Sequence, residues 1–124
     1  MAWARTGFTY VAYALGLLLV IQFFLAGYGV ANLGANQDAL DMHETVGGIM
    51  HLLALVMVVL ALFARYRGAL LGMTIALFIL ATLQYVWIDA GSAFVRGFHV
   101  LGALFIAMII REITGQIRER APAT

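Results

Sequence analysis

Four long apolar runs, separated by short polar connections, constrain this chain more than any other feature of its sequence. They extend over about 6–30, 42–64, 68–88 and 92–112. Each provides the roughly 20 apolar residues that a helix needs to cross a hydrocarbon core about 30 Å thick. The runs are unbroken and lack the alternation of a barrel strand. We therefore expect an all-α fold: a single domain, 1–124, built as a four-transmembrane-helix bundle in up-down-up-down order.

The composition supports lipid as the solvent and excludes several classes of function. Hydrophobic residues make up 65% of the chain and charged residues 10%, so a fold of this size lacks the polar residues to cover its surface in water. Cysteine is absent, which excludes disulfides, thiolate metal sites and covalent c-type haem attachment. The formal net charge is only +1, which argues against a nucleic-acid-binding surface.

The charged residues predict the orientation of the bundle. One expected side collects six arginines, which are Arg5, Arg65, Arg67, Arg111, Arg118 and Arg120. The other side collects the acidic residues Asp38, Asp41, Glu44 and Asp89, with Arg96 as its one basic residue. By the positive-inside rule we expect both termini to be cytoplasmic, in a multi-pass protein of the inner (plasma) membrane. About 111–120 then form an amphipathic cytoplasmic extension that lies against an anionic leaflet.

Three histidines within the apolar runs are the main candidate site residues, because ionisable side chains inside a bilayer are costly. His43, Gly47 and His51 are spaced i, i+4 and i+8, so they lie on one face of the second expected helix. On the fourth helix, His99 follows Arg96 by three residues and shares a face with it.

The sequence gives two indications of which histidine faces His99. Depths counted from Glu44 and Phe94 place His51 about 10 Å and His99 about 8 Å below the interface, which favours that pair. An internal repeat favours His43 with His99 instead. Its matching parts are Gln22-Phe23-Phe24 with Gln84-Tyr85-Val86, and Met42-His43 followed by Gly47 with Phe98-His99 followed by Gly102. The choice stays open at this stage.

Two imidazoles facing each other across a membrane bundle suit one haem b, whose iron takes a histidine nitrogen on each side. Gly47 and Gly102 are expected to give the porphyrin room, and Arg96 is expected to contact a propionate. The apolar walls are expected to come from Phe23, Phe24, Phe98 and Phe105. We expect a haem-binding electron carrier rather than an enzyme.

On these histidines and this topology, the chain resembles membrane-bound b-type cytochromes, in which histidines on facing helices ligate haem. It also resembles a set of small bacterial four-helix membrane proteins of undetermined activity. That second resemblance is carried by Gln-Phe-Phe-Leu-Ala-Gly (22–27) at the end of the first helix and a histidine followed by glycine at the start of the second.

Two other functions remain open. His43, His51 and His99, with Asp41 or Glu44, form a candidate ligand set for a transition-metal ion. Alternatively, the chain is a non-catalytic small subunit or assembly factor of a larger membrane complex, and its histidines are structural. Small-residue spacings such as Ala12 to Gly16 suit close helix packing and equally suit a homodimer.

Overall fold

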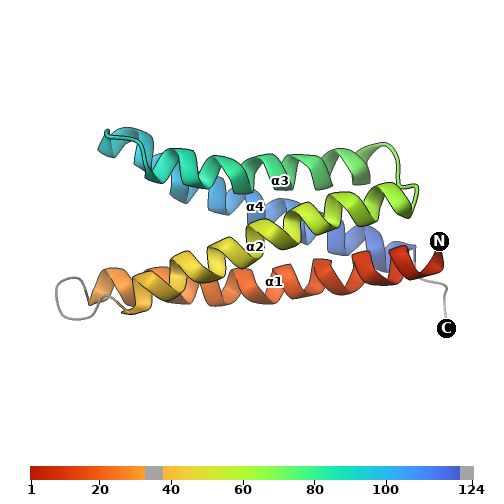
Figure 1. Ribbon diagram of the computed structural model, residues 1–124, viewed down its shortest axis with the longest axis horizontal. Coiled ribbons are helices and arrows are strands. Elements are labelled where there is room, and N and C mark those ends of the chain that lie inside the picture. The colour runs from red at the N-terminus through yellow and green to blue at the C-terminus, as the bar shows by residue number, and fades with distance from the viewer. Residues whose placement is uncertain (33–37, 121–124) are drawn as a thin grey trace.

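The computed structural model describes residues 1–32 and 38–120. These residues form four helices, which are α1 (Ala2–Ala31), α2 (Asp38–Phe63), α3 (Ala69–Ile88) and α4 (Ala93–Glu119) (Figure 1). The described part of the chain contains no strand. The predicted all-α four-helix fold is therefore confirmed.

Each of the four helices is long and apolar enough to cross a membrane, and the chain is a multi-pass membrane protein. α1 begins at Ala2 and α2 at Asp38, each four residues before the expected start. α4 runs without a break to Glu119, so the expected extension is its last part. The 30 residues of α1 span about 45 Å at 1.5 Å per residue, which exceeds the hydrocarbon thickness. The ends of α1 therefore reach the headgroup layers.

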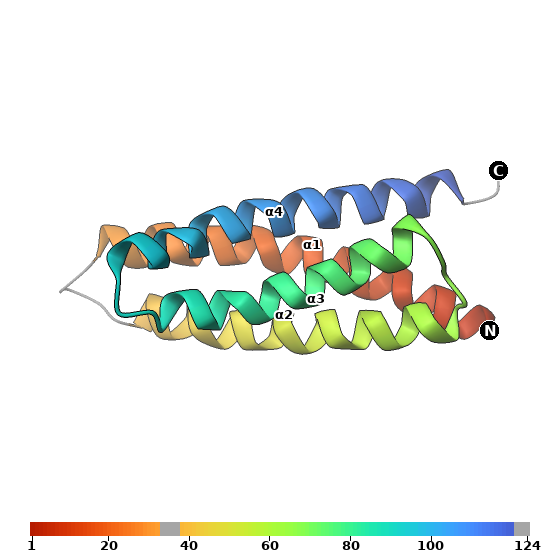
Figure 2. The same cartoon turned by 90° about the horizontal axis from the view of Figure 1, so that it is seen from above.

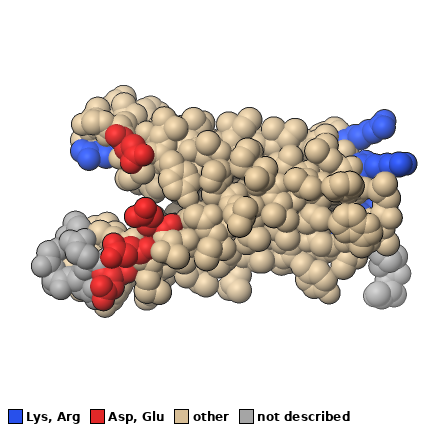
Figure 3. All heavy atoms as spheres, viewed as in Figure 1, with Lys and Arg blue, Asp and Glu red and all other residues tan. Residues whose placement is uncertain are grey.

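The helices form two hairpins that run side by side. α1 packs against α2 and α3 against α4, while α2–α3 and α1–α4 contacts close the ring. α2 and α4 are therefore diagonal to each other. Figures 1 and 2 show successive helices running in opposite directions, so that the start of α1 and the end of α4 lie at the same end of the bundle. We call it the basic end, and the opposite end, with Asp38, Glu44 and Asp89, the acidic end. In Figure 3 the acidic side chains lie at one end of one face and arginines lie at the other, with a further basic group beside the acidic ones.

A tight turn connects the two hairpins at the basic end. The Tyr66 N–H donates to the Ala61 carbonyl at 3.0 Å, which closes α2 with the 6→1 bond of a Schellman motif. Arg65 and Gly68 have φ values of 58° and 62°, and only glycine adopts this left-handed conformation without a steric cost. At the acidic end, Ser92 occupies the N-cap position of α4, but its side chain makes no capping hydrogen bond.

The continuous hydrophobic core fills only the half of the bundle next to the basic end. Its largest fully buried apolar side chains are Phe8, Leu15, Met57, Leu70, Leu77 and Ile113. Towards the acidic end the core cluster stops near the helix midpoints, at Leu19, Met50, Leu77 and Ile106. Beyond this level the two hairpins diverge (Figure 1) and the surface is indented between them (Figure 3).

Candidate functional site

His43 and His99 meet in the half of the bundle that lacks an apolar core. Their ring centroids are 6.1 Å apart and their planes are inclined by 60°. His43 is the sixth residue of α2 and His99 the seventh of α4, so the two rings bridge the diagonal of the bundle at similar depth. Both residues are partly buried. The structure thus brings together the pair that the internal repeat favours.

The main chain of the neighbouring helix holds each of these rings. Nδ1 of His43 lies 3.2 Å from the Gln22 carbonyl oxygen, and Nδ1 of His99 lies 3.4 Å from the Gln84 carbonyl oxygen. A carbonyl oxygen only accepts, so each Nδ1 carries the proton and donates it. In a neutral imidazole this leaves Nε2 unprotonated, with a lone pair available to a metal. The two rings therefore present equivalent donor atoms.

The glutamine side chains beside the histidines are incompletely hydrogen bonded. Nε2 of Gln22 donates to the His43 carbonyl oxygen at 2.8 Å. The buried atoms Gln22 Oε1 and Gln84 Nε2 find no hydrogen-bond partner among the described residues. Buried polar atoms without a hydrogen-bond partner are uncommon in folded proteins. The polar cluster formed by His43, His99, Gln22 and Gln84, which we call the histidine–glutamine cluster, therefore has unused hydrogen-bonding capacity.

Gly47 and Gly102 serve this cluster differently from the expectation that they admit a porphyrin. A Cβ atom on Gly47 would lie 3.1 Å from Gln22 Nε2. A Cβ atom on Gly102 would overlap Gln84 Nε2 and the Trp87 ring. The space beside both glycines is taken by side chains of the neighbouring helix, so the glycines permit the close approach that carries Gln22 and Gln84 to the histidines.

His51 has different surroundings from the other two histidines. Its Nε2 lies 3.0 Å from Thr82 Oγ1, and its ring stacks on Phe78 at 5.3 Å and contacts Tyr85 at 5.3 Å. The Thr82 hydroxyl already donates to the Phe78 carbonyl, so His51 Nε2 carries the hydrogen of this bond. All these contacts are to α3. Within 1–32 and 38–120, no group of three or more His, Asp or Glu side chains is placed to hold a metal ion.

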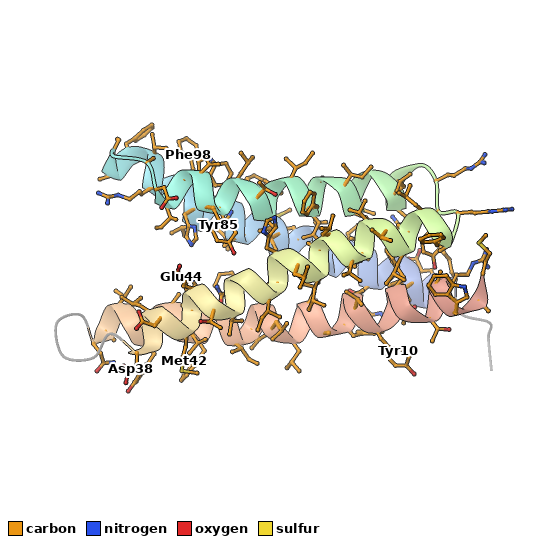
Figure 4. All side chains as sticks on the ribbon, viewed as in Figure 1. Tyr10, Asp38, Met42, Glu44, Tyr85 and Phe98 are labelled. Atoms are coloured by element: carbon orange, nitrogen blue, oxygen red, sulfur yellow. The ribbon has the colours of Figure 1, made fainter. Side chains whose placement is uncertain are left out.

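The remaining expected site residues lie around the cluster. Arg96 is exposed, one turn before His99 at the start of α4. The four phenylalanines expected as walls are 40–67% exposed, and their part in a cofactor site stays a prediction. Figure 4 instead shows Glu44 of α2 and Tyr85 of α3 in the space between the hairpins. This placement could not be predicted from the sequence, because Tyr85 also fits an interfacial aromatic residue.

Comparison with known proteins places the chain in a family without revealing an activity. The pattern of the DUF6220 family matches residues 22–92, which is more than half of the chain. The matched segment contains Gln22, His43 and Gln84 and ends before α4. No curated protein and no solved structure matches the chain. The chain belongs to DUF6220, a family of unknown function.

Proposed function

We propose that this protein binds one haem b between His43 and His99 and carries electrons in the membrane. The observation that carries the proposal is the pair of neighbouring imidazoles, with ring centroids 6.1 Å apart, each with Nδ1 bound to a main-chain carbonyl. In metal sites, a histidine ligand almost always donates its other ring N–H to a carbonyl or carboxylate, which fixes its tautomer and orientation. His43 and His99 both have this arrangement.

The separation of the rings supports the same assignment. A metal–nitrogen bond of about 2.0–2.1 Å on each side, with the nitrogen roughly 1.1 Å from its ring centre, separates two axial imidazole centroids by about 6.3 Å. The measured separation is 6.1 Å. Haem supplies four equatorial nitrogens to its iron, so two histidines complete an octahedral set. A bare metal ion, in contrast, usually takes three or four protein ligands.

The surroundings of the pair also suit a large planar cofactor. The hydrophobic core ends below this level and the hairpins diverge above it (Figure 1). Arg96 stands one turn closer to the acidic end than His99, where its guanidinium can pair with a propionate. With both histidines bound, the iron would keep no free coordination position, so the haem would supply one-electron transfer rather than oxygen binding. His43 and His99 would hold the cofactor, and their Nδ1 bonds would keep both rings fixed in either redox state.

The distribution of arginine predicts the orientation of the protein in the membrane. The basic end carries six arginines, so we assign it to the cytoplasm by the positive-inside rule. The proposed haem then lies in the outer half of the inner (plasma) membrane. A redox partner would approach the acidic end, where Glu44 and Asp89 are exposed. The resemblance to b-type cytochromes therefore rests on one pair of histidines, His43 and His99.

The test is an absorption spectrum of the protein expressed with added haem and purified in detergent, before and after reduction with dithionite. We expect one b-type haem per chain, with a sharpened Soret band and split α and β bands on reduction. His43→Ala and His99→Ala should each lose this spectrum. His51→Ala is the matched control, because it removes the same side chain from α2 without touching the pair, and it should keep the haem. A haem that survives loss of either His43 or His99 would refute the assignment, and a colourless wild-type protein would favour the subunit alternative.

A further inference from the structure

A groove with two arginines in its lining lies between α1 and α4 at the basic end, far from the histidine–glutamine cluster. Its volume is about 440 Å³. The lining residues are Arg5, Thr6, Thr9, Tyr10 and Tyr13 of α1, Tyr66 of the α2–α3 turn, and Ile117 and Arg120 near the end of α4. Two arginines from distant parts of the sequence thus share one groove, and no Asp or Glu is among the residues that line it.

The packing of Tyr66 organises this groove. Its ring meets Phe8 edge-on at a centroid distance of 4.9 Å, which anchors it to the buried core. The Arg120 guanidinium lies 5.7 Å from the centre of the same ring and within 3.4 Å of the Gln116 amide oxygen. These contacts leave part of the five-donor guanidinium free. The Arg120 side chain is therefore held at the groove with its charge unneutralised by any carboxylate of the described residues.

The position of the groove relates it to the membrane surface. Tyr10 and Tyr13 are 72% and 47% exposed, and Figure 4 shows Tyr10 pointing away from the bundle. Tyrosine is enriched where the hydrocarbon core meets the headgroups. Arg5 is one turn nearer the end of α1, which is the side of the headgroups. The groove therefore has a lipid-facing edge at the tyrosines and a cationic end at Arg5 and Arg120.

We propose that this groove binds the phosphate headgroup of an anionic phospholipid. Arg5 and Arg120 would bind the phosphate oxygens, because guanidinium groups pair with phosphate through two parallel hydrogen bonds. The Thr6 and tyrosine hydroxyls would supply further donors, whereas the Thr9 hydroxyl already donates to the Arg5 carbonyl. The acyl chains would follow the exposed apolar surface of α1. The inference is independent of haem binding, since it uses none of the residues of the histidine–glutamine cluster.

The test is native mass spectrometry of the detergent-purified protein titrated with phosphatidylglycerol or with phosphatidylcholine of the same acyl chains. We expect selective retention of phosphatidylglycerol. A direct arginine–phosphate contact contributes at least roughly a fivefold increase in affinity, so Arg5→Gln with Arg120→Gln should weaken binding by at least roughly 25-fold. The matched control is Arg65→Gln with Arg67→Gln, which removes the same charge from the same end but outside the groove. These two charges would act on the phosphate only through screening solvent, so the control should change the affinity by less than about threefold.

Three results would overturn the proposal: equal losses in both double variants, equal retention of the two lipids, or displacement of phosphatidylglycerol by inorganic phosphate alone. The last result would identify a soluble phosphate as the ligand. If the double glutamine variant fails to fold, Arg5→Lys with Arg120→Lys keeps the charge and tests the bidentate contacts. It should weaken binding by about fivefold, because lysine acts as a point charge without the planar fork.

Discussion

Substitution of Gly102 by alanine tests the helix contact on which the histidine–glutamine cluster depends. The new methyl group would overlap Gln84 Nε2 and the Trp87 ring. Both neighbours belong to α3, so either α4 moves away from α3 or both side chains leave their positions. Gly97→Ala is the matched control on the same helix, because a Cβ atom there meets nothing within 4 Å.

The comparison of these two variants isolates the steric cost. Both replace glycine by alanine inside a helix, which by itself favours the helix by about 1 kcal/mol. Forcing an extra methyl group into a packed site costs about 1–3 kcal/mol. The free energy of unfolding of Gly102→Ala should therefore be about 1–3 kcal/mol below that of Gly97→Ala. Gly47→Ala, whose Cβ would approach Gln22 Nε2 to 3.1 Å, should fall between them.

The assay is unfolding in one detergent, followed by far-ultraviolet circular dichroism, with all variants prepared free of haem. Omitting haem separates the packing argument from the proposed function. Equal stability of Gly102→Ala and Gly97→Ala would show that α3 and α4 are not as close as described. If haem is then added, Gly102→Ala should bind it more weakly than Gly97→Ala, since movement of α4 away from α3 would lengthen the contact between His99 Nδ1 and the main-chain carbonyl of Gln84.

Two further predictions concern other helix contacts. Gly29→Ala would place a Cβ atom 2.5 Å from Leu40 Cδ2, whereas a Cβ atom in the control Gly27→Ala meets nothing within 4 Å. The free energy of unfolding of Gly29→Ala should therefore be about 1–2 kcal/mol below that of Gly27→Ala. Equal stability of the two variants would contradict the packing of α1 on α2. Thr82→Val removes the hydroxyl that accepts a hydrogen bond from His51. It should lower the free energy of unfolding by about 0.6 kcal/mol, the average for such bonds between membrane helices, and leave the absorption spectrum of bound haem unchanged. A changed spectrum would show that His51 belongs to the cofactor site.

The fold was predictable from the sequence because the bilayer leaves few alternatives. A backbone that crosses hydrocarbon must satisfy its own hydrogen bonds, so long apolar runs become helices. Short connections such as Arg65–Gly68 then force successive helices to be antiparallel neighbours. The ends of the helices were less predictable. α1 and α2 both extend beyond their apolar runs. In α2 the extension is the polar stretch that begins at Asp38, whose carboxylate is favourable in the first turn of a helix.

The histidine pair was only partly predictable, because its depth depends on where α2 begins. Counting depth from Glu44 assumed that α2 enters the membrane there, but α2 begins at Asp38, more than one turn earlier. From the observed helix starts, His43 rather than His51 has the same depth as His99. The part played by the main-chain carbonyls of Gln22 and Gln84 left no trace in the sequence, since every residue has a carbonyl.

The internal repeat explains both the pairing and its faint signal in the sequence. Two hairpins that run in the same direction around a shared axis bring equivalent residues to equal depth, and residues close to the axis face each other. Gln22 with His43 and Gln84 with His99 are equivalent in this sense, as their matching hydrogen bonds show. The separations along the chain differ because α1 continues nine residues past Gln22, whereas α3 ends four residues after Gln84. A site on such an axis occurs once per chain, so the proposed haem would be bound once per chain, by two histidine ligands. A second haem per chain would contradict it.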